Sequence, residues 1–224
     1  LVATAGGPVV VVADTVFSMD GDVLDVAAVA GVCRRHGALL VLDEAHAVLG
    51  PEPSPADLDG VEVVRVGTLS KALGALGGYA ACSARVADLL VNAARSSIFT
   101  TALAPADTAA ALASLGIVRS PEGDRLRATL RAHVDRLAPG HPSPIVPVVL
   151  GDEEQAVEAA SCLLEAGLHV PAIRPPTVAP GTSRLRVTFS AAHTDHDVTR
   201  LVDALGPLLA QTPEPRPTQP SGRP

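Results

Sequence analysis

Aromatic residues are scarce in this sequence, and their scarcity disfavours one class of binding site. The 224 residues include three Phe, one Tyr and no Trp. Proteins that bind single-stranded nucleic acid commonly stack successive bases on several aromatic side chains. The net charge of −7 at pH 7 likewise disfavours contact with a phosphate backbone. We therefore expect no nucleic-acid partner.

Cysteine and long apolar runs are also lacking. Three Cys, an odd number without paired spacing, give neither a disulfide framework nor a CxxC metal site. We therefore expect a reducing, cytoplasmic location and no metal ion. No apolar run reaches the ~18 residues that a membrane-spanning helix needs, and no basic region of a signal peptide opens the chain. We expect no membrane partner, and because the chain starts at Leu1 we interpret it as the C-terminal portion of a longer protein.

The residues that are abundant predict a folded α/β protein. Apolar residues make up 47% of the chain and charged residues 18%. Hydrophobic patterning predicts strands at 8–13, 38–42, 61–66 and 78–82, with helices at 22–36 and 84–94. Asp20 or Asp22 is expected to cap the first helix, and Gly37 to end it. The alternation of strand and helix predicts a parallel sheet covered on both faces.

The pattern changes after Pro105, which predicts a second domain. Helices are expected at 107–115, 122–137, 153–166 and 195–209, and strands at 145–150, 168–173 and 184–190. In the last strand Leu185, Val187 and Phe189 share one face. We assign 1–105 to the C-terminal part of a large domain, 106–210 to a small α+β domain, and 211–224 to a disordered, Pro-rich tail.

Polar side chains follow several predicted strands. In open parallel sheets, ligands bind beyond the carboxyl ends of the strands. Asp43 follows the second predicted strand, with His46 three residues later, and Thr68 and Lys71 follow the third. Ser18 lies shortly after the first. We expect a carboxylate, an imidazole, a hydroxyl and an amine to meet at one edge of the sheet.

Lys71 is the only lysine in a chain with sixteen Arg. A lysine amine forms a Schiff base once it is deprotonated, whereas a guanidinium cannot. Lys71 lies in the glycine-rich stretch Gly67-Thr68-Leu69-Ser70-Lys71-Ala72-Leu73-Gly74, which lets backbone approach a ligand closely. This context indicates covalent amine chemistry rather than a solvated charge. Asp43 either caps the next helix or pairs with a pyridinium nitrogen, and His46 is either structural or faces the same pocket.

Three ordered motifs closely resemble the α-oxoamine synthases: Phe17-Ser18-Met19-Asp20-Gly21-Asp22, Leu42-Asp43-Glu44-Ala45-His46 and Thr68-Leu69-Ser70-Lys71-Ala72-Leu73-Gly74. These enzymes use pyridoxal 5'-phosphate (PLP), have the fold type I of aspartate aminotransferase, and condense an amino acid with an acyl thioester while releasing carbon dioxide. The resemblance covers about residues 8–205. It implies an α/β fold of this type and a homodimer in the full-length form.

A later stretch resembles the branch of this family that serves biotin synthesis. It comprises Val170-Pro171-Ala172-Ile173-Arg174-Pro175-Pro176-Thr177-Val178, Gly181-Thr182 and Arg184-Leu185-Arg186. This branch implies L-alanine and a pimeloyl thioester, carried on coenzyme A or acyl carrier protein, as substrates. Ala179 departs from the proline that is usual there. A glycine C-acetyltransferase, another α-oxoamine synthase, and a truncated homologue without catalysis stay open as alternatives.

The resemblance also implies residue roles around the cofactor. Lys71 would hold PLP covalently and move the α-proton of the substrate, and Asp43 would pair with the ring nitrogen. Ser18 and His46 would lie near the phenolic oxygen of the ring, and Thr68 would help to position the ring or the phosphate.

Further roles are implied beyond the ring. Arg186 would bind the amino-acid carboxylate as a bidentate fork, with Thr177 beside the substrate. Thr100 and Thr101 match a segment that reaches the phosphate of the neighbouring subunit. Simpler interpretations compete here: Thr100 and Thr101 are plain loop hydroxyls, and Arg186, like Arg184, is a surface residue on an alternating strand.

One of these motifs is shared with another class of protein. Asp43-Glu44-Ala45-His46 also spells a helicase signature, but that function needs a GxxxxGK[ST] phosphate loop upstream. The single lysine lies downstream and is followed by Ala72, so we favour the PLP interpretation. The resemblance further implies that the phosphate-binding loop and a histidine that stacks on the ring belong to a first half of the family's sequence that is not in this chain. We therefore expect an exposed sheet edge, exposed apolar faces and no activity of the chain alone.

Overall fold

The computed structural model describes residue 2 and residues 6–209 of the chain. These residues form two compact units. The first comprises the described residues up to Val146 together with Phe189–Ala191, and the second comprises Pro147–Thr188 and the described residues from Ala192 onward. The predicted tail at 211–224 lies outside the described residues, and the predicted domain boundary at residue 105 stays a prediction. None of the described helices combines the length and apolarity that crossing a membrane requires.

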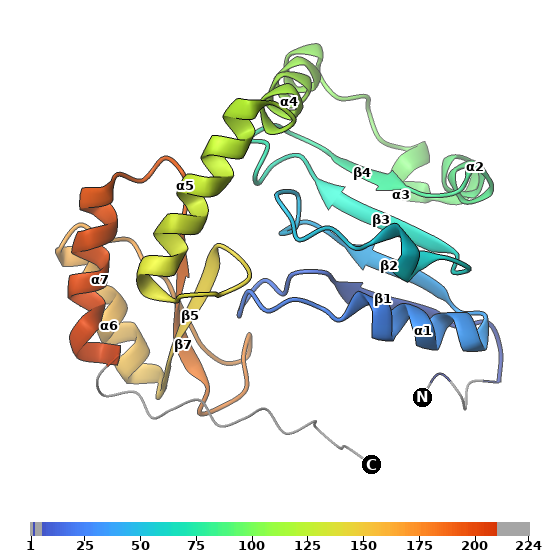
Figure 1. The fold of residues 1–224 in the computed structure, drawn as a ribbon. Coiled ribbons are helices and arrows are strands. Elements are labelled where there is room, and N and C mark those ends of the chain that lie inside the picture. The colour runs from blue at the N-terminus through green and yellow to red at the C-terminus, as the bar shows by residue number, and fades with distance from the viewer. Residues whose placement is uncertain (1, 3–5, 210–224) are drawn as a thin grey trace. The chain divides into compact units, whose positions relative to one another are not determined.

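The first unit contains a four-stranded sheet whose strands follow the order of the chain (Figure 1). β1 (Val10–Asp14), β2 (Leu39–Asp43) and β3 (Val63–Thr68) run parallel, and β4 (Gly78–Ala81) pairs antiparallel with β3. Helix α1 (Val26–His36) connects β1 to β2. The sequence prediction of a parallel α/β sheet is confirmed.

Helix α1 begins at a different cap from the one that the sequence suggested. Its N-cap is Asp25, whose side chain accepts a hydrogen bond from the Ala28 amide at 2.9 Å. The prediction of Asp20 or Asp22 as cap is wrong, because the preceding residues form a tight turn instead. Gly37 ends the helix in the left-handed conformation with φ 61°, as predicted.

The core of this unit lies between α1 and one face of the sheet. The buried residues Val26, Ala30, Cys33, Ala38, Leu40 and Leu42 form one cluster. The partly buried side chains of Val9 and Val11 pack against it, so the alternate residues Val10 and Val12 point to the opposite face. Those two valines are 56% and 67% exposed.

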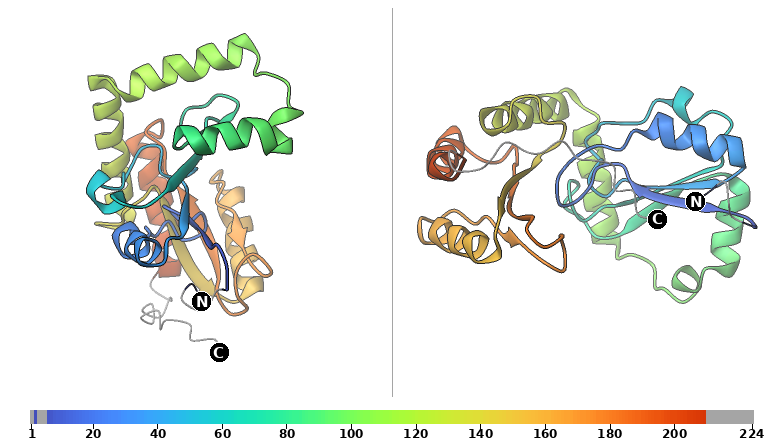
Figure 2. Two further views of the ribbon diagram at one scale, coloured as in Figure 1. Left: turned by 90° about the vertical axis from the view of Figure 1, so that its right-hand side faces the viewer. Right: turned by 90° about the horizontal axis from the view of Figure 1, so that it is seen from below.

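The face of the four-stranded sheet that points away from α1 is only partly covered. The right-hand view of Figure 2 shows α1 and α2 (Ala84–Ala93) on opposite sides of the sheet. Nevertheless Val10, Val12 and every residue of β4 are exposed within the part of the chain that the structure describes. The prediction of a sheet covered on both faces therefore fails here, and the expected exposed apolar face is present.

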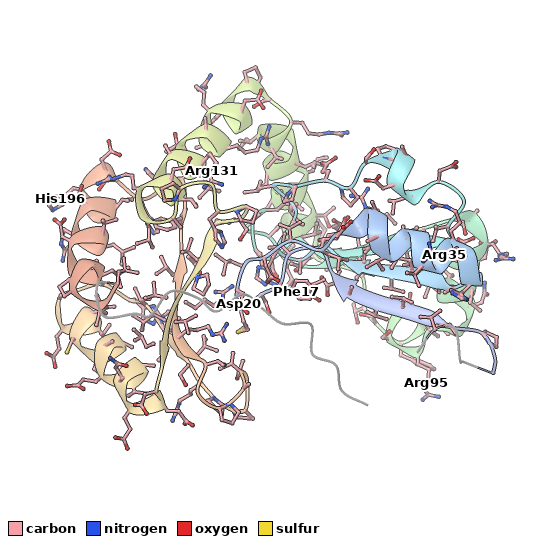
Figure 3. The ribbon with its side chains drawn as sticks, turned by 60° about the horizontal axis from the view of Figure 1, so that its bottom comes forward. Phe17, Asp20, Arg35, Arg95, Arg131 and His196 are labelled. Atoms are coloured by element: carbon pink, nitrogen blue, oxygen red, sulfur yellow. The ribbon has the colours of Figure 1, made fainter. Side chains whose placement is uncertain are left out.

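Four further helical segments belong to the first unit. They are η2 (Pro55–Leu58), α3 (Arg95–Ile98), α4 (Pro105–Val118) and α5 (Pro121–Leu137). α4 and α5 correspond to the helices predicted at 107–115 and 122–137. At their junction a side chain on Gly123 would come within 2.5 Å of the carbonyl oxygens of Ile117 and Val118, so only glycine allows this approach. Figure 3 labels Arg131 on α5 and Arg95 at the start of α3.

The second unit is built around a three-stranded sheet. β5 (Ile145–Gly151) begins in the first unit and continues into the second, and the strand order is β5, β7 (Ser183–Thr188), β6 (Ala172–Ile173). Helices α6 (Glu153–Glu165) and α7 (Asp195–Leu209) complete the unit. The face predicted from Leu185, Val187 and Phe189 is buried. The strand predicted at 168–173 is shorter than expected: Pro171 has no amide hydrogen to add to a ladder, and its carbonyl accepts from the Arg186 amide at 2.9 Å.

Candidate active site

The three parallel strands of the first unit end on polar residues at the same edge of the sheet. β1 ends at Asp14, β2 at Asp43 and β3 at Thr68. Asp14 pairs in register with Asp43, and Asp43 pairs with Val66 of β3. Because parallel strands share one direction, their carboxyl ends meet where ligands bind in such sheets.

Asp43 is held firmly by its neighbours. The amide and the hydroxyl of buried Thr15 both donate to its carbonyl oxygen, at 2.8 and 3.1 Å. Its Oδ1 accepts from the Ala45 amide at 2.9 Å, and because residues 45–49 form turns, Asp43 caps a turn and not the predicted helix. Its Oδ2 makes no hydrogen bond with any described residue. The half-buried carboxylate is thus fixed at one oxygen and keeps the other for a ligand.

Lys71 and His46 meet although they are 25 residues apart in the chain. Lys71 Nζ lies 2.8 Å from His46 Nε2. The lysine is exposed and the histidine is half-buried. Lys71 sits in the loop between β3 and β4, which the Leu69 amide closes by donating to the Gly77 carbonyl at 2.9 Å. An imidazole at this distance can take a proton from the amine or return one.

Thr68 shapes the loop that carries the lysine. Its Oγ1 lies 2.7 Å from Ser70 Oγ, accepts from the Ser70 amide at 3.1 Å, and donates to the Gly77 carbonyl at 3.3 Å. These hydrogen bonds span both sides of the loop. The hydroxyls of Thr68 and Ser70 therefore stand together near the start of the segment that ends at Lys71.

Ser18 is half-buried in the tight turn that follows β1. The turn is closed by two hydrogen bonds, from the Gly21 amide to the Phe17 carbonyl at 2.8 Å and from the Phe17 amide to the Asp22 carbonyl at 3.0 Å. Gly21 has φ 69°, and a Cβ there would overlap the Ile145 carbonyl oxygen. Figure 3 labels Phe17 and Asp20, which lie on either side of Ser18 in the chain.

An ion pair supports the Asp43–His46 segment from the α1 side of the sheet. Arg65 Nε lies 2.6 Å from an oxygen of Glu44, which is only 5% exposed. Tyr79 pairs with Gly67 across the β3–β4 hairpin, and a Cβ on Gly67 would meet its ring at 2.5 Å. Burial, with Glu44 adding to it, raises the pKa of Tyr79. Sequence reasoning missed this group, because alternation along one strand does not give the register in which neighbouring strands pair.

Asp14 and Thr15 were missed as well, although a signal existed. The predicted first strand stopped at residue 13, and Asp14 is the polar residue that follows it, as Asp43 follows the second strand. Burial raises the pKa of Asp14, the nearby Asp43 carboxylate raises it further, and Lys71 opposes both.

The second unit places Arg184 and Arg186 two residues apart on β7. Arg184 is 8% exposed and its Nε donates to the Thr182 carbonyl at 2.9 Å, so its interpretation as a surface residue is wrong. Arg186 is half-buried and donates to Thr188 Oγ1 at 3.1 Å. Burial lowers the pKa of both guanidinium groups. Thr177 is exposed, and its amide donates to the Arg174 carbonyl at 3.0 Å.

Thr100 and Thr101 lie in the exposed segment between α3 and α4. Thr100 Oγ1 donates weakly to the Thr101 carbonyl at 3.4 Å. Their proposed contact with a phosphate of another subunit stays a prediction.

The donor set of the first unit suits an aromatic aldehyde with a cationic ring nitrogen better than a metal. It offers an amine for a carbonyl, an imidazole beside that amine, and an acceptor oxygen of Asp43 for an N–H group. Thr68 and Ser70 offer paired hydroxyls to an anionic group. Within residues 6–209, no three His, Cys, Asp or Glu residues gather in a way that could hold a metal ion.

The chain is similar to one family model and to relatives that share one name. A family model described as aminotransferase class I and II matches residues 2–205. The 8-amino-7-oxononanoate synthase of Anaeromyxobacter dehalogenans is 48% identical over 92% of the chain, and that of Bordetella petrii is 45% identical over 88%. The chain spans only 56% and 54% of these two relatives, about half their length.

Solved structures resemble the same part of the chain. A serine palmitoyltransferase from S. paucimobilis with bound PLP-myriocin aldimine is 27% identical, with a TM-score of 0.80, over 93% of this chain and 58% of that one. The serine palmitoyltransferase of Sphingomonas wittichii is 28% identical, with a TM-score of 0.78, over 95% and 58%. An 8-amino-7-oxononanoate synthase from Francisella tularensis, at 21% identity and a TM-score of 0.74 over 93% and 65%, shares the fold. The fold type I architecture expected from the sequence is confirmed.

Proposed function

The chain belongs to the aminotransferase class I and II family, and we therefore propose that it forms part of a PLP-dependent acyltransferase. The reaction is the decarboxylative condensation of an amino acid with an acyl thioester. The observation that carries this proposal is the single lysine, whose Nζ lies 2.8 Å from His46 Nε2 at the sheet edge where Asp43 ends β2. The names of the relatives support L-alanine and a pimeloyl thioester as substrates, 8-amino-7-oxononanoate as product, and a role in biotin synthesis.

PLP, when bound, supplies an electrophilic carbonyl and a ring that accepts electrons. Lys71 Nζ would hold the cofactor covalently, and this requires a neutral amine. His46 Nε2, at 2.8 Å, is placed to take the proton that the amine gives up. Lys71 Nζ would also be the base that removes the α-proton of the amino acid.

Asp43 would orient the ring through its nitrogen. Its Oδ2 would accept a hydrogen bond from the ring N–H group, while Oδ1 and the carbonyl oxygen are fixed by Ala45 and Thr15. A carboxylate held in one orientation favours the protonated ring nitrogen, because an opposite charge stabilises a cation. Thr68 and Ser18 contribute hydroxyls to the phosphate and ring oxygens. In the second unit, Arg186 binds the amino-acid carboxylate with its planar guanidinium, and Thr177 contacts the same substrate.

The likeness to serine palmitoyltransferases supports a second candidate within the same reaction class. An enzyme of that kind would take another amino acid and a long-chain acyl thioester. A glycine C-acetyltransferase would take acetyl instead. A truncated homologue without catalysis remains the alternative outside enzymes.

We expect the chain alone to be inactive, since it spans about half of its relatives. The complete enzyme is proposed to be a cytoplasmic homodimer. The test is a condensation assay with PLP, L-alanine and pimeloyl-CoA or pimeloyl acyl carrier protein, detecting 8-amino-7-oxononanoate by mass spectrometry. It is run on the chain alone and with the first half of the Anaeromyxobacter dehalogenans relative supplied as a second chain. Product only in the presence of both chains supports the proposal, whereas product from serine and palmitoyl-CoA instead favours the second candidate.

A further inference from the structure

Asp14 is a carboxylate at the proposed cofactor site whose role the resemblance leaves open. It ends β1 and lies in register with Asp43 on the adjacent parallel strand. Adjacent strands are about 4.8 Å apart. Because Val9 and Val11 pack towards α1, Asp14 shares the opposite face with Val10 and Val12.

Asp43 takes that same face. Leu40 and Leu42 of β2 belong to the buried cluster beneath α1, so the intervening positions of the strand, Val41 and Asp43, point the other way. The two carboxylates therefore stand next to each other on one face of the sheet, at the edge where the strands end.

This arrangement is unfavourable without a ligand. Asp14 is half-buried, and its carboxylate makes no hydrogen bond with any residue that the structure describes. Two ionised carboxylates at such a distance repel each other, and burial removes part of the water that would screen them. Like-charged pairs of this kind are concentrated at functional sites, where a cation relieves the repulsion.

We propose that Asp14 is a positioning residue of the cofactor site, which acts through Asp43 to strengthen the hold of that carboxylate on a protonated ring nitrogen. This role rests on the proposed function. The residue that follows supports it, because Thr15 donates two hydrogen bonds to the Asp43 carbonyl. At the end of β1, Asp14 thus adds negative charge beside Asp43, and Thr15 fixes the backbone of Asp43.

The charged groups that act on Asp14 come from two other elements. Asp43 faces it from β2, and Lys71 acts on it from the loop after β3. His46 belongs to the same cluster of titratable side chains, because its Nε2 lies 2.8 Å from Lys71 Nζ. Removing the charge of Asp14 should therefore lower the proton affinity of a bound ring nitrogen.

Two control variants separate the charge of Asp14 from other effects. Asp14→Glu keeps the carboxylate, and Asp88→Asn removes a charge from the exposed surface of α2. Both variants should leave the titration of a bound ring nitrogen unchanged, whereas Asp14→Asn should shift it.

The experiment supplies the first half of the Anaeromyxobacter dehalogenans relative as a second chain. It then adds PLP labelled with nitrogen-15 in the ring and follows the ring nitrogen by its chemical shift. In Asp14→Asn the ring nitrogen should lose its proton at a pH about one unit lower than in the native chain, a tenfold fall in proton affinity. Asp14→Glu should restore the native titration. If PLP binds and the two titrations coincide, the role of Asp14 is overturned while the proposed function stands. If the native two-chain protein fails to bind PLP at all, the proposed function is refuted and the role of Asp14 with it.

Discussion

Asp43 shows how one side chain can serve the fold and a ligand together. Its Oδ1 caps the following turn at Ala45, a structural role close to the helix cap that the sequence suggested. Its Oδ2 has no partner among residues 6–209, which matches the functional role. The two interpretations that competed at the sequence level therefore concern different oxygens of one carboxylate.

Replacing this carboxylate by an amide separates the two roles. Asp43→Asn keeps a carbonyl oxygen for the Ala45 amide, so the unfolding temperature should change little. The amide cannot hold a full positive charge on a ring nitrogen, so turnover of the two-chain enzyme should fall by about 100-fold or more. Turnover is measured as product formed per minute at saturating L-alanine. Near-native turnover would mean that Asp43 is only a turn cap.

The raised pKa of Asp14 predicts how the stability of the folded chain depends on pH. Its pKa in the folded chain is raised above the ordinary value by burial and by Asp43. A raised carboxyl pKa means that the folded state binds this proton more tightly than the unfolded state, so the contribution to stability declines as pH rises through that range. Asp14→Asn should therefore unfold at a higher temperature than the native chain near neutral pH, and the difference should vanish below about pH 3.8. A less stable variant at neutral pH would contradict this prediction.

Among the helices, those with clear boundaries were predicted well, whereas short connections were not. The helix predicted at 195–209 has the same bounds in the structure. The helix predicted at 22–36 begins at Val26, because the residues before it form a hydrogen-bonded turn closed onto Phe17. A turn stabilised by packing against residues far along the chain, such as Ile145, leaves no local signal in the sequence.

The start of α1 offers a matched pair of variants. Asp25→Ala removes the side chain that accepts from the Ala28 amide, and it should lower the free energy of unfolding by about 1 kcal/mol. Asp22→Ala should change it by less than about 0.5 kcal/mol, because Asp22 takes part in the turn through its backbone carbonyl. Urea unfolding followed by circular dichroism measures both. Equal losses in the two variants would refute the assignment of Asp25 as cap.

Gly21 supports the turn that carries Ser18. Gly21→Ala should destabilise the chain by about 2 kcal/mol or more, because φ is 69° and the new Cβ would overlap the Ile145 carbonyl oxygen. Gly140→Ala is the control, since φ is 79° there and nothing lies within 4 Å of the new atom. The free energy of unfolding of this control should fall by only about 1 kcal/mol, the cost of a positive φ for alanine. If thermal unfolding shows equal losses for both, the close packing of the turn contributes nothing.

Across the molecule, the sequence predicted which polar residues gather but not how they are supported. Strand ends in a parallel sheet meet at one edge, so Asp43 and Thr68 could be placed from patterning alone. The contact between Lys71 and His46 depends on the path of the loop after β3, which patterning does not determine. The ion pair of Glu44 with Arg65 depends on the face that each residue takes. The exposed Val10 and Val12 could be anticipated only from the family, whose members are about twice as long.

The proposed function depends above all on Lys71 holding the cofactor, and covalent trapping tests this role directly. The chain is incubated with PLP, reduced with borohydride, digested, and its modified peptide identified by mass spectrometry. Lys71 provides the only side-chain amine, so the N-terminal amine of Leu1 is the sole competing amino group. We predict one adduct, on the peptide that contains Lys71, and its loss in Lys71→Arg, which keeps the positive charge. An adduct confined to the N-terminal peptide, with Lys71 unmodified, would contradict the assignment of Lys71 as the cofactor-binding lysine.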